Sequence, residues 1–234
     1  MKIAIMQPYF FPYIGYFQLI NAVDEFVIYD NIEYTKKGWI NRNRILVNGK
    51  DSYISLPLKK DSDHLDVRDR YLADSWSFEK HKMLNRIIAS YRKAPCFDSA
   101  YPVIERSILF EESNLFSFIL NSLNLVREYL GISTPLLVSS TIRVDHELKA
   151  EKKVIAICKA RKADIYINPI GGIQIYSKVD FRSEDIDLCF LRTTDFVYQQ
   201  SGNEFYPFLS IIDVMMFNSK EEIMKYLTSF YAIV

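Results

Sequence analysis

The first thirty residues constrain the fold of this chain more strongly than any other stretch. A short apolar run at residues 3–6 is ended by Gln7 and Pro8, and a second apolar run at residues 26–29 leads to Asp30. Between the two runs, apolar side chains recur at roughly helical spacing from residue 14 to residue 23. This pattern predicts a strand, a helix and a second strand, with both strands buried in a sheet.

The turn between the first strand and the helix is the first candidate binding segment. In open α/β sheets, ligands bind outside the carboxyl ends of the strands, and this turn lies at such an end. Its polar, aromatic and glycine residues, which we expect to bind substrate, are Gln7, Tyr9, Tyr13, Gly15 and Tyr16.

The rest of the chain continues the alternation of strands and helices. Further apolar runs predict strands at residues 136–138, 164–168 and 188–191. The dipeptide Asn48-Gly49 between apolar runs at 45–47 and 53–58 predicts a β-hairpin, because these residues tolerate the positive φ of a tight turn. We therefore expect a single α/β domain over residues 1–234, built on a Rossmann-like parallel sheet of about five strands, with an insertion at residues 32–74 (hairpin and charged loop) and a helical block at residues 75–131.

Charge, hydropathy and cysteine content limit the classes of partner and compartment. The chain has 29 basic and 29 acidic residues, so its total charge gives no indication of a nucleic-acid partner. No run of about 18 apolar residues occurs, which predicts a soluble protein without a membrane span, and Gln7-Pro8 interrupts the apolar stretch that a signal peptide would need. The cysteines lack CxxC spacing and the histidines are far apart in sequence, so we expect a cytoplasmic protein with no metal and no cofactor.

A basic and aromatic cluster lies within the insertion. Lys36, Lys37, Arg42 and Arg44 surround Trp39. Arginine and lysine side chains bind phosphate, and an aromatic ring stacks on a base or a sugar, so the cluster predicts an anion site. A solvated loop around one buried tryptophan explains the same composition, and the sequence leaves both interpretations open.

The remaining candidate binding residues lie at or after predicted strands or in the polar loop near the carboxyl terminus. The paired glycines among them allow backbone N–H groups to approach a phosphate closely. The two serines have either a ligand contact or a turn and capping role. These residues are Ser139, Ser140, Asn168, Gly171, Gly172 and Tyr198.

His81 is the leading candidate for a general base. It lies in the first turns of a predicted helix between two lysines, whose charges disfavour the charged imidazole. A surface or packing role also fits a lone helical histidine, and Asp30 and Glu33 are alternative bases. His146 is interpreted mainly as a helix-boundary residue. Asp213, within an apolar helix, is either a structural anchor or a site carboxylate, and the anchor is favoured.

Five blocks of the chain carry a resemblance to a known family: MQPYFFPYIGYFQLI, YTKKGWINRNRI, KHKML with KAP after it, INPIGG and LSIIDVMMFN. In this order they resemble the WbqC-like family of bacterial proteins. That family is encoded among genes for O-antigen and other surface polysaccharides, so the resemblance implies a cytoplasmic role in making surface glycan on a nucleotide-activated sugar. The turn FPYIGY also resembles the H-x-G-H turn of the nucleotidylyltransferase superfamily, with Tyr13 and Tyr16 at the histidine positions. Phenols are neutral at pH 7 and supply no positive charge, which argues against nucleotidyl transfer on a shared fold.

The leading functional hypothesis is a transferase of O-antigen biosynthesis that moves an acyl or aminoacyl group to the amine of a nucleotide-linked amino sugar. No serine or cysteine lies in a nucleophile-elbow motif, which favours direct attack by the sugar amine. An acyl or aminoacyl carrier protein is a candidate donor, and a homodimer is a candidate assembly. Two alternatives stay open: activation of a substrate with a nucleoside triphosphate, and a non-catalytic module that binds a nucleotide sugar or a glycan complex.

Overall fold

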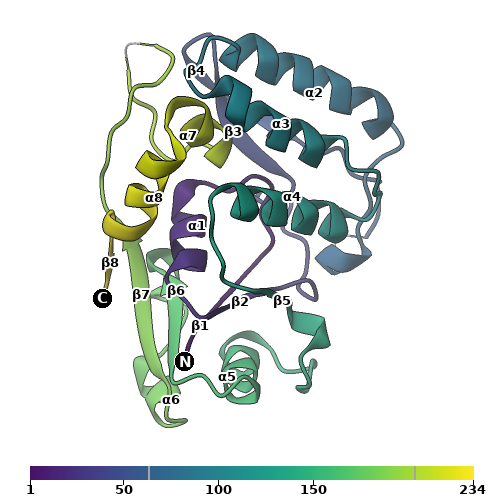
Figure 1. Cartoon of the computed structure of the whole chain (residues 1–234). Coiled ribbons are helices and arrows are strands. Elements are labelled where there is room, and N and C mark those ends of the chain that lie inside the picture. The colour runs from purple at the N-terminus through teal and green to yellow at the C-terminus, as the bar shows by residue number, and fades with distance from the viewer. Residues whose placement is uncertain (63, 203) are drawn as a thin grey trace.

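The centre of the molecule is a six-stranded sheet with helices around it (Figure 1). The computed structural model describes residues 1–62, 64–202 and 204–234. The strand order is β5-β2-β1-β6-β7-β8, and every neighbouring pair is parallel except β7 and β8. The strands are β1 (Lys2–Met6), β2 (Glu25–Ile28), β5 (Leu136–Val138), β6 (Ile165–Pro169), β7 (Asp187–Thr193) and β8 (Tyr231–Ile233). The Rossmann-like parallel sheet is confirmed with all five expected strands.

The sixth strand, β8, was not expected from the sequence. It has only three residues, two of them exposed, and lies at the end of the chain. It pairs antiparallel with β7, with Ala232 opposite Arg192. Its conformation depends on this edge of the sheet rather than on an apolar pattern of its own.

Helices cover both faces of the sheet because successive side chains of β1 point to opposite sides. Ala4 belongs to an apolar cluster that includes residues of α1 (Ile14–Asn21), α7 (Ile211–Phe217) and α8 (Lys220–Ser229). Ile3 and Ile5 belong to a second cluster, which includes residues of α5 (Ala150–Ala160) and α6 (Lys178–Arg182). The three β1 side chains are at most 3% exposed, so β1 is buried on both faces as expected.

The strand order places a topological switch point between β1 and β6. From β1 the chain moves outward through α1 to β2 and later to β5, and it returns through α5 to β6 on the other side of β1. At such a point, loops leave the carboxyl ends of two adjacent strands in opposite directions and form a crevice. The turns after β1 and β6 are therefore the structural basis for a ligand site.

The hairpin insertion consists of β3 (Arg42–Val47) and β4 (Lys50–Ser55). Asn48 and Gly49 form its turn with φ values of 52° and 74°, as a two-residue hairpin turn requires. The second strand begins at Lys50 rather than at residue 53, because the tight turn pairs Lys50 with Val47 directly.

The helical block consists of α2 (Trp76–Tyr91), α3 (Phe97–Ile108) and α4 (Leu115–Tyr129). Its apolar side chains join the cluster of α1, and so do those of the hairpin. Short 3-10 turns lie between the longer elements: η1 (Val67–Asp69), η2 (Ser139–Thr141) and η3 (Ile170–Gly172).

Asp213 on α7 is a buried anchor for the loop that follows β7. Its side chain is fully buried and accepts hydrogen bonds from Tyr91 Oη at 2.8 Å, Tyr198 Oη at 2.7 Å and Gln200 Nε2 at 3.0 Å. Burial raises the pKa of the Asp213 carboxyl, and the three hydrogen bonds oppose that shift. The contacts join α7 to α2 and to the loop, which agrees with the anchor role inferred from the sequence.

Replacing Asp213 by asparagine should lower the free energy of unfolding by about 1–3 kcal/mol, because buried donors on its partners lose an acceptor. Urea denaturation at pH 7 measures this loss. Asp195→Asn changes an exposed carboxyl in the same loop and should alter stability by less than about 0.5 kcal/mol. Equal stability of both variants and the parent would contradict the anchor role.

Candidate functional site

Two chambers lie along the carboxyl ends of the parallel strands. The first, which we call the aromatic chamber, has a volume of about 300 Å³. It is formed by the turn after β1, the hairpin, the turn after β6 and the end of β7. Its lining residues are Tyr9, Pro12, Tyr13, Trp39, Asn43, Arg44, Ile170, Leu191, Thr193 and Phe208.

The second chamber, which we call the polar chamber, has a volume of about 560 Å³. It lies beyond the end of β2, between the loop that contains η1 and the start of α5. Its lining residues are Tyr29, Asn31, Ile32, Glu33, Asp66, Arg68, His146, Glu147, Leu148, Lys149, Ala150, Lys153, Val154 and Tyr176.

The segment after β6 contributes to the lining of both chambers. Ile170 lines the aromatic chamber, and Tyr176 lines the polar chamber. A Cβ atom on Gly172 would lie 1.9 Å from Nδ2 of Asn168, which is buried, and 3.5 Å from the Tyr176 ring. A Cβ atom on Gly171 would have no neighbour within 4 Å. Gly172 is therefore required by packing, whereas Gly171 leaves open space next to the backbone.

Arg44 is the cation of the predicted basic cluster that lines the aromatic chamber. Its guanidinium lies 5.8 Å from the Trp39 ring centroid and its NH1 lies 2.8 Å from Asp51 Oδ2. Its Nε is buried without a hydrogen-bond partner among the described residues. Trp39 stacks on Tyr53 at 6.3 Å between ring centroids. The chamber thus combines an aromatic platform with a guanidinium.

The other cations of that cluster lie elsewhere. Arg42 donates to the backbone oxygens of Lys37 at 2.7 Å and Gly38 at 3.1 Å, so it stabilises the loop that carries Trp39. Lys37 is exposed, and Lys36 lines a separate surface groove beside Arg70.

The aromatic residues of the turn after β1 have different roles. Tyr16 is 1% exposed, and its hydroxyl donates to the backbone oxygen of Gln7 at 2.9 Å, so it belongs to the core. Tyr9 and Tyr13 line the aromatic chamber. Burial raises the pKa of both phenols, so each is a neutral hydroxyl at pH 7. Gly15 lies under Tyr13, because a Cβ atom there would be 2.3 Å from the Tyr13 ring.

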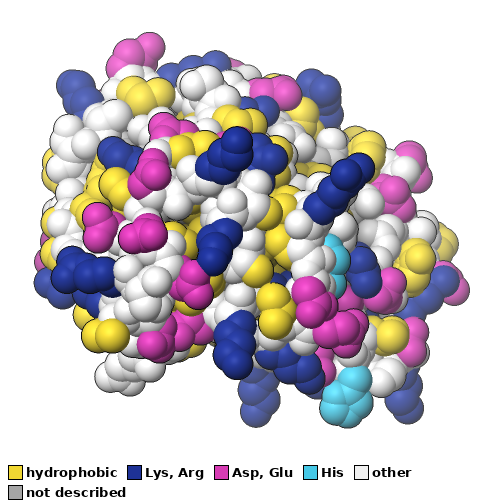
Figure 2. Space-filling model, turned by 90° about the horizontal axis from the view of Figure 1, so that it is seen from below, with side chains coloured by type: hydrophobic (Ala, Val, Ile, Leu, Met, Phe, Trp, Pro, Cys, Tyr) yellow, Lys and Arg dark blue, Asp and Glu magenta, His cyan; other side chains and the backbone are white. Residues whose placement is uncertain are grey.

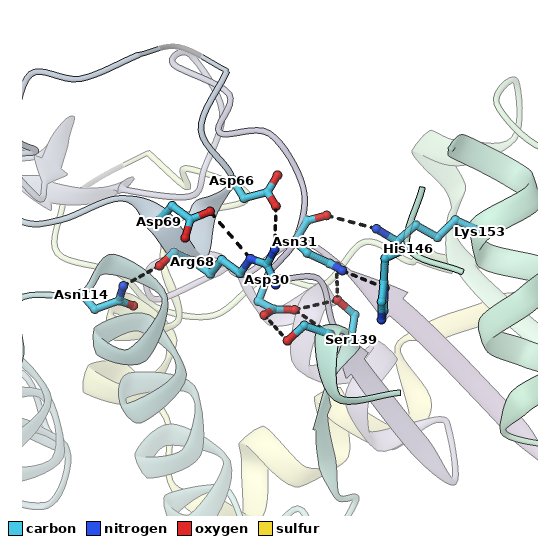
Figure 3. Close-up of polar contacts among 10 residues, drawn as sticks. Asp30, Asn31, Asp66, Arg68, Asp69, Asn114, Ser139, His146 and Lys153 are labelled. Atoms are coloured by element: carbon cyan, nitrogen blue, oxygen red, sulfur yellow. Dashed lines mark hydrogen bonds and ion pairs between the residues drawn. The ribbon is translucent and has the colours of Figure 1, made fainter. Parts of the chain in front are cut away.

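Asp30 joins the ends of β2 and β5 beside the polar chamber (Figure 3). Its carboxylate is 3% exposed. It accepts hydrogen bonds from Ser139 Oγ at 2.8 Å, from Ser140 N at 2.9 Å and from Ser140 Oγ at 2.5 Å. The structure therefore brings together three residues that the sequence singled out separately. Both serines donate hydrogen bonds to the Asp30 carboxylate.

His146 and Lys153 approach the end of β2 from the side of α5, as Figure 3 shows. His146 Nδ1 lies 3.0 Å from Asn31 Nδ2, and Asn31 Oδ1 lies 2.6 Å from Ser139 Oγ. The Lys153 ammonium donates to the backbone oxygen of Asn31 at 3.2 Å and lies 5.4 Å from the Tyr29 ring centroid. Burial lowers the pKa of the Lys153 amine, and the carboxylates of Asp66 and Asp30 oppose that shift.

Asp66 and Arg68 form the opposite wall of the polar chamber. Arg68 NH2 lies 3.5 Å from Asp66 Oδ2, and its Nε lies 3.7 Å from Asp69 Oδ2. Burial raises the pKa of the Asp66 carboxyl, and the positive charge of Arg68 opposes the shift.

The remaining predicted site residues lie in different parts of the molecule. His81 is exposed on α2 in the helical block, and His81 lines neither chamber. Glu33 is exposed and lines the polar chamber. Tyr198 donates to Asp213 and is part of the buried anchor described above.

Sequence reasoning missed His146, Lys153, Asp66 and Arg68 as candidate functional residues. His146 precedes a predicted helix, and the other three belong to charged stretches that are typical of solvated surface. Only Lys153 had a usable signal, because it occupies a core-facing position of α5 next to Val154.

The chain is similar in sequence to known proteins. The model of the WbqC-like protein family matches residues 7–225, a range that includes both chambers. This chain belongs to the WbqC-like family. The chain is also 34% identical, over 97% of its own length and 97% of the relative's, to "Uncharacterized protein Rv1507c" of Mycobacterium tuberculosis. No solved structure matches it.

Surface charge in this WbqC-like protein is mixed. Figure 2 shows basic and acidic side chains interleaved over one face, as the equal totals of 29 and 29 lead one to expect. Across the described ranges, no helix has the length and apolar character to cross a membrane.

Replacing Gly172 by alanine should destabilise the protein by about 1–3 kcal/mol, because the new methyl group must displace the buried Asn168 amide. Thermal unfolding followed by circular dichroism measures the loss. Gly171→Ala is the matched control and should leave the stability of the free protein within about 0.5 kcal/mol of the parent. Unchanged stability of the Gly172→Ala variant would show that the close contact between Gly172 and Asn168 does not hold the turn after β6.

Proposed function

We propose that this WbqC-like protein is a cytoplasmic transferase that acts on a nucleotide-linked amino sugar in the biosynthesis of surface polysaccharide. The observation that supports the proposal most directly is the pair of chambers on the segment after β6. The aromatic chamber has side chains that can stack on a base and bind a phosphate, and the polar chamber has side chains that can accept or donate a proton. A ligand with an aromatic base at one end and a sugar at the other matches this order.

The nucleotide would occupy the aromatic chamber. Its base would stack on the exposed Trp39, and the Arg44 guanidinium, which lines the chamber, would bind a phosphate oxygen. Tyr9 and Tyr13 would donate hydrogen bonds from neutral hydroxyls. The diphosphate would cross the open backbone at Gly171, and the sugar would reach the polar chamber.

His146 would be the general base. The Ser139 hydroxyl has one proton but lies near two oxygens, Asp30 Oδ1 at 2.8 Å and Asn31 Oδ1 at 2.6 Å. A half-turn of the Asn31 amide lets its nitrogen donate to Ser139 and its oxygen accept from His146 Nδ1. The proton of the neutral imidazole then sits on Nδ1, and the Nε2 lone pair is available to the ligand.

The transfer itself would be a direct aminolysis. The sugar amine attacks the carbonyl of an acyl or aminoacyl thioester, presented by a carrier protein. A C–N bond forms, the C–S bond breaks, the thiolate leaves, and His146 takes the proton that the amine loses. The proton then passes to the thiolate, so the imidazole returns to its neutral form.

Arg44→Gln should abolish the stabilisation of the protein by nucleotide sugars, because it removes the one cation among the described residues that line the aromatic chamber. Thermal shift with a panel of uridine and thymidine diphosphate sugars measures this effect. Lys50→Gln removes an exposed cation at the start of β4 in the same hairpin and should retain the full shift. Stabilisation by magnesium and ATP alone would favour the nucleotidyl-transfer alternative.

His146→Gln should lower the transfer rate by about 100-fold or more while it leaves substrate binding intact, because general-base catalysis contributes about 10²–10⁴-fold. Single-turnover transfer to the nucleotide amino sugar measures the rate. The same assay on His81→Gln compares the two candidate bases: loss of rate in that variant alone would identify His81 instead. Tight binding without turnover by the parent would favour a binding module.

A further inference from the structure

Asp30, Ser139, Asn31 and His146 form one chain of polar contacts beside the polar chamber (Figure 3). Asp30 Oδ1 lies 2.8 Å from Ser139 Oγ, which lies 2.6 Å from the side-chain amide of Asn31. That amide lies 3.0 Å from His146 Nδ1. Asp30, Asn31 and Ser139 are buried, so their polar atoms depend on one another for hydrogen bonds rather than on water.

The Asp30 end of the chain accepts hydrogen bonds and donates none, because a carboxylate has no proton to give. The backbone N–H of Ser140 donates to Oδ1 at 2.9 Å, and Ser140 Oγ donates to Oδ2 at 2.5 Å. These two contacts hold the carboxylate in place. Oδ1 therefore faces the Ser139 hydroxyl as a fixed, charged acceptor.

An acceptor at this end sets the direction of every hydrogen bond in the chain. The single proton of Ser139 goes to the carboxylate, because a charged acceptor forms a stronger hydrogen bond than an amide oxygen does. Ser139 Oγ then presents only lone pairs to Asn31, so the amide nitrogen must donate to it. The amide oxygen consequently faces His146 and accepts from Nδ1.

The opposite orientation of the Asn31 amide is unfavourable at a buried site. It would leave Ser139 Oγ facing one of two oxygens, at 2.6 or 2.8 Å, with no proton between them. An acceptor that is buried without a donor costs free energy, so the orientation that satisfies all four residues is preferred.

We propose that Asp30 and Ser139 are positioning residues for His146: they orient the Asn31 amide so that the neutral imidazole holds its proton on Nδ1 and presents the Nε2 lone pair to the polar chamber. This role rests on the base function of His146 in the proposed function and extends it to two residues that need no contact with the ligand. The chain sets an orientation and transfers no proton. The tautomer is therefore already set in the ligand-free protein.

Imidazole nitrogen chemical shifts of the ligand-free protein, measured by NMR at about pH 8.5 where an ordinary imidazole is neutral, test the inference. The signals of the three histidines are assigned with the variants His64→Gln, His81→Gln and His146→Gln. His146 of the parent should be in the Nδ1–H form. Ser139→Ala should lose this preference in favour of the Nε2–H form, because the Asn31 amide is then free to turn its nitrogen toward Nδ1.

Two further variants separate the orientation of the chain from its folding. Ser140→Ala removes a hydroxyl that donates to Asp30 outside the chain, so it should keep the Nδ1–H form. Asp30→Asn keeps the shape of the side chain and removes its charge, so the Ser139 proton is shared between two neutral oxygens and His146 should show both tautomers. If Ser139→Ala does not fold, Asp30→Asn decides alone.

An Nε2–H form in the parent would overturn the inference, and so would an unchanged Nδ1–H form in Ser139→Ala or, where that variant does not fold, in Asp30→Asn. In the transfer assay, Ser139→Ala should lower kcat by about 10-fold or more and leave KM unchanged, because it alters the base and not the ligand contacts. A parent that shows the expected tautomer response without any transfer would contradict the proposed function alone, so the two failures are distinguishable.

Discussion

The buried carboxylate of Asp30 is the contact on which the polar chamber depends. It accepts three hydrogen bonds from Ser139 and Ser140 and so joins the ends of β2 and β5, which are distant in sequence. Ser139 also contacts the Asn31 amide. Asn31 in turn contacts His146 with its side chain and Lys153 with its backbone oxygen. One carboxylate thus positions a candidate base and a buried amine through a chain of short contacts.

Two of the buried charged residues, Asp213 and Lys153, have different surroundings. Asp213 has three donors around it and lies in the core, where it connects α2, α7 and the loop after β7. Lys153 has one acceptor and lines a chamber. Several donors around one buried carboxylate fix its position and contribute to the specificity of the fold, whereas Lys153 is held by one hydrogen bond and by the nearby charges of Asp66 and Asp30.

The sheet order explains why both chambers lie on one edge. The switch point between β1 and β6 opens a crevice, and the glycine turn after β6 contributes residues to both sides of it. The insertion brings Trp39, in the loop before β3, and Arg44, on β3, to this edge. A nucleotide-linked substrate that spans the turn would use both chambers, which is the basis of the proposed function.

The five parallel strands, the helices between them and the Asn-Gly hairpin follow from local patterns, because apolar periodicity and turn residues act over a few positions. The Asp30 network, the placement of His146 and Lys153, and strand β8 do not, since each depends on partners about forty or more residues away that only the assembled sheet brings into contact. The basic cluster shows the same division. Its composition predicted an anion site, but the fold assigned Arg42 to its own loop and left Arg44 to line the chamber. Composition reports which charges are near in sequence, and tertiary packing decides which of them face a ligand.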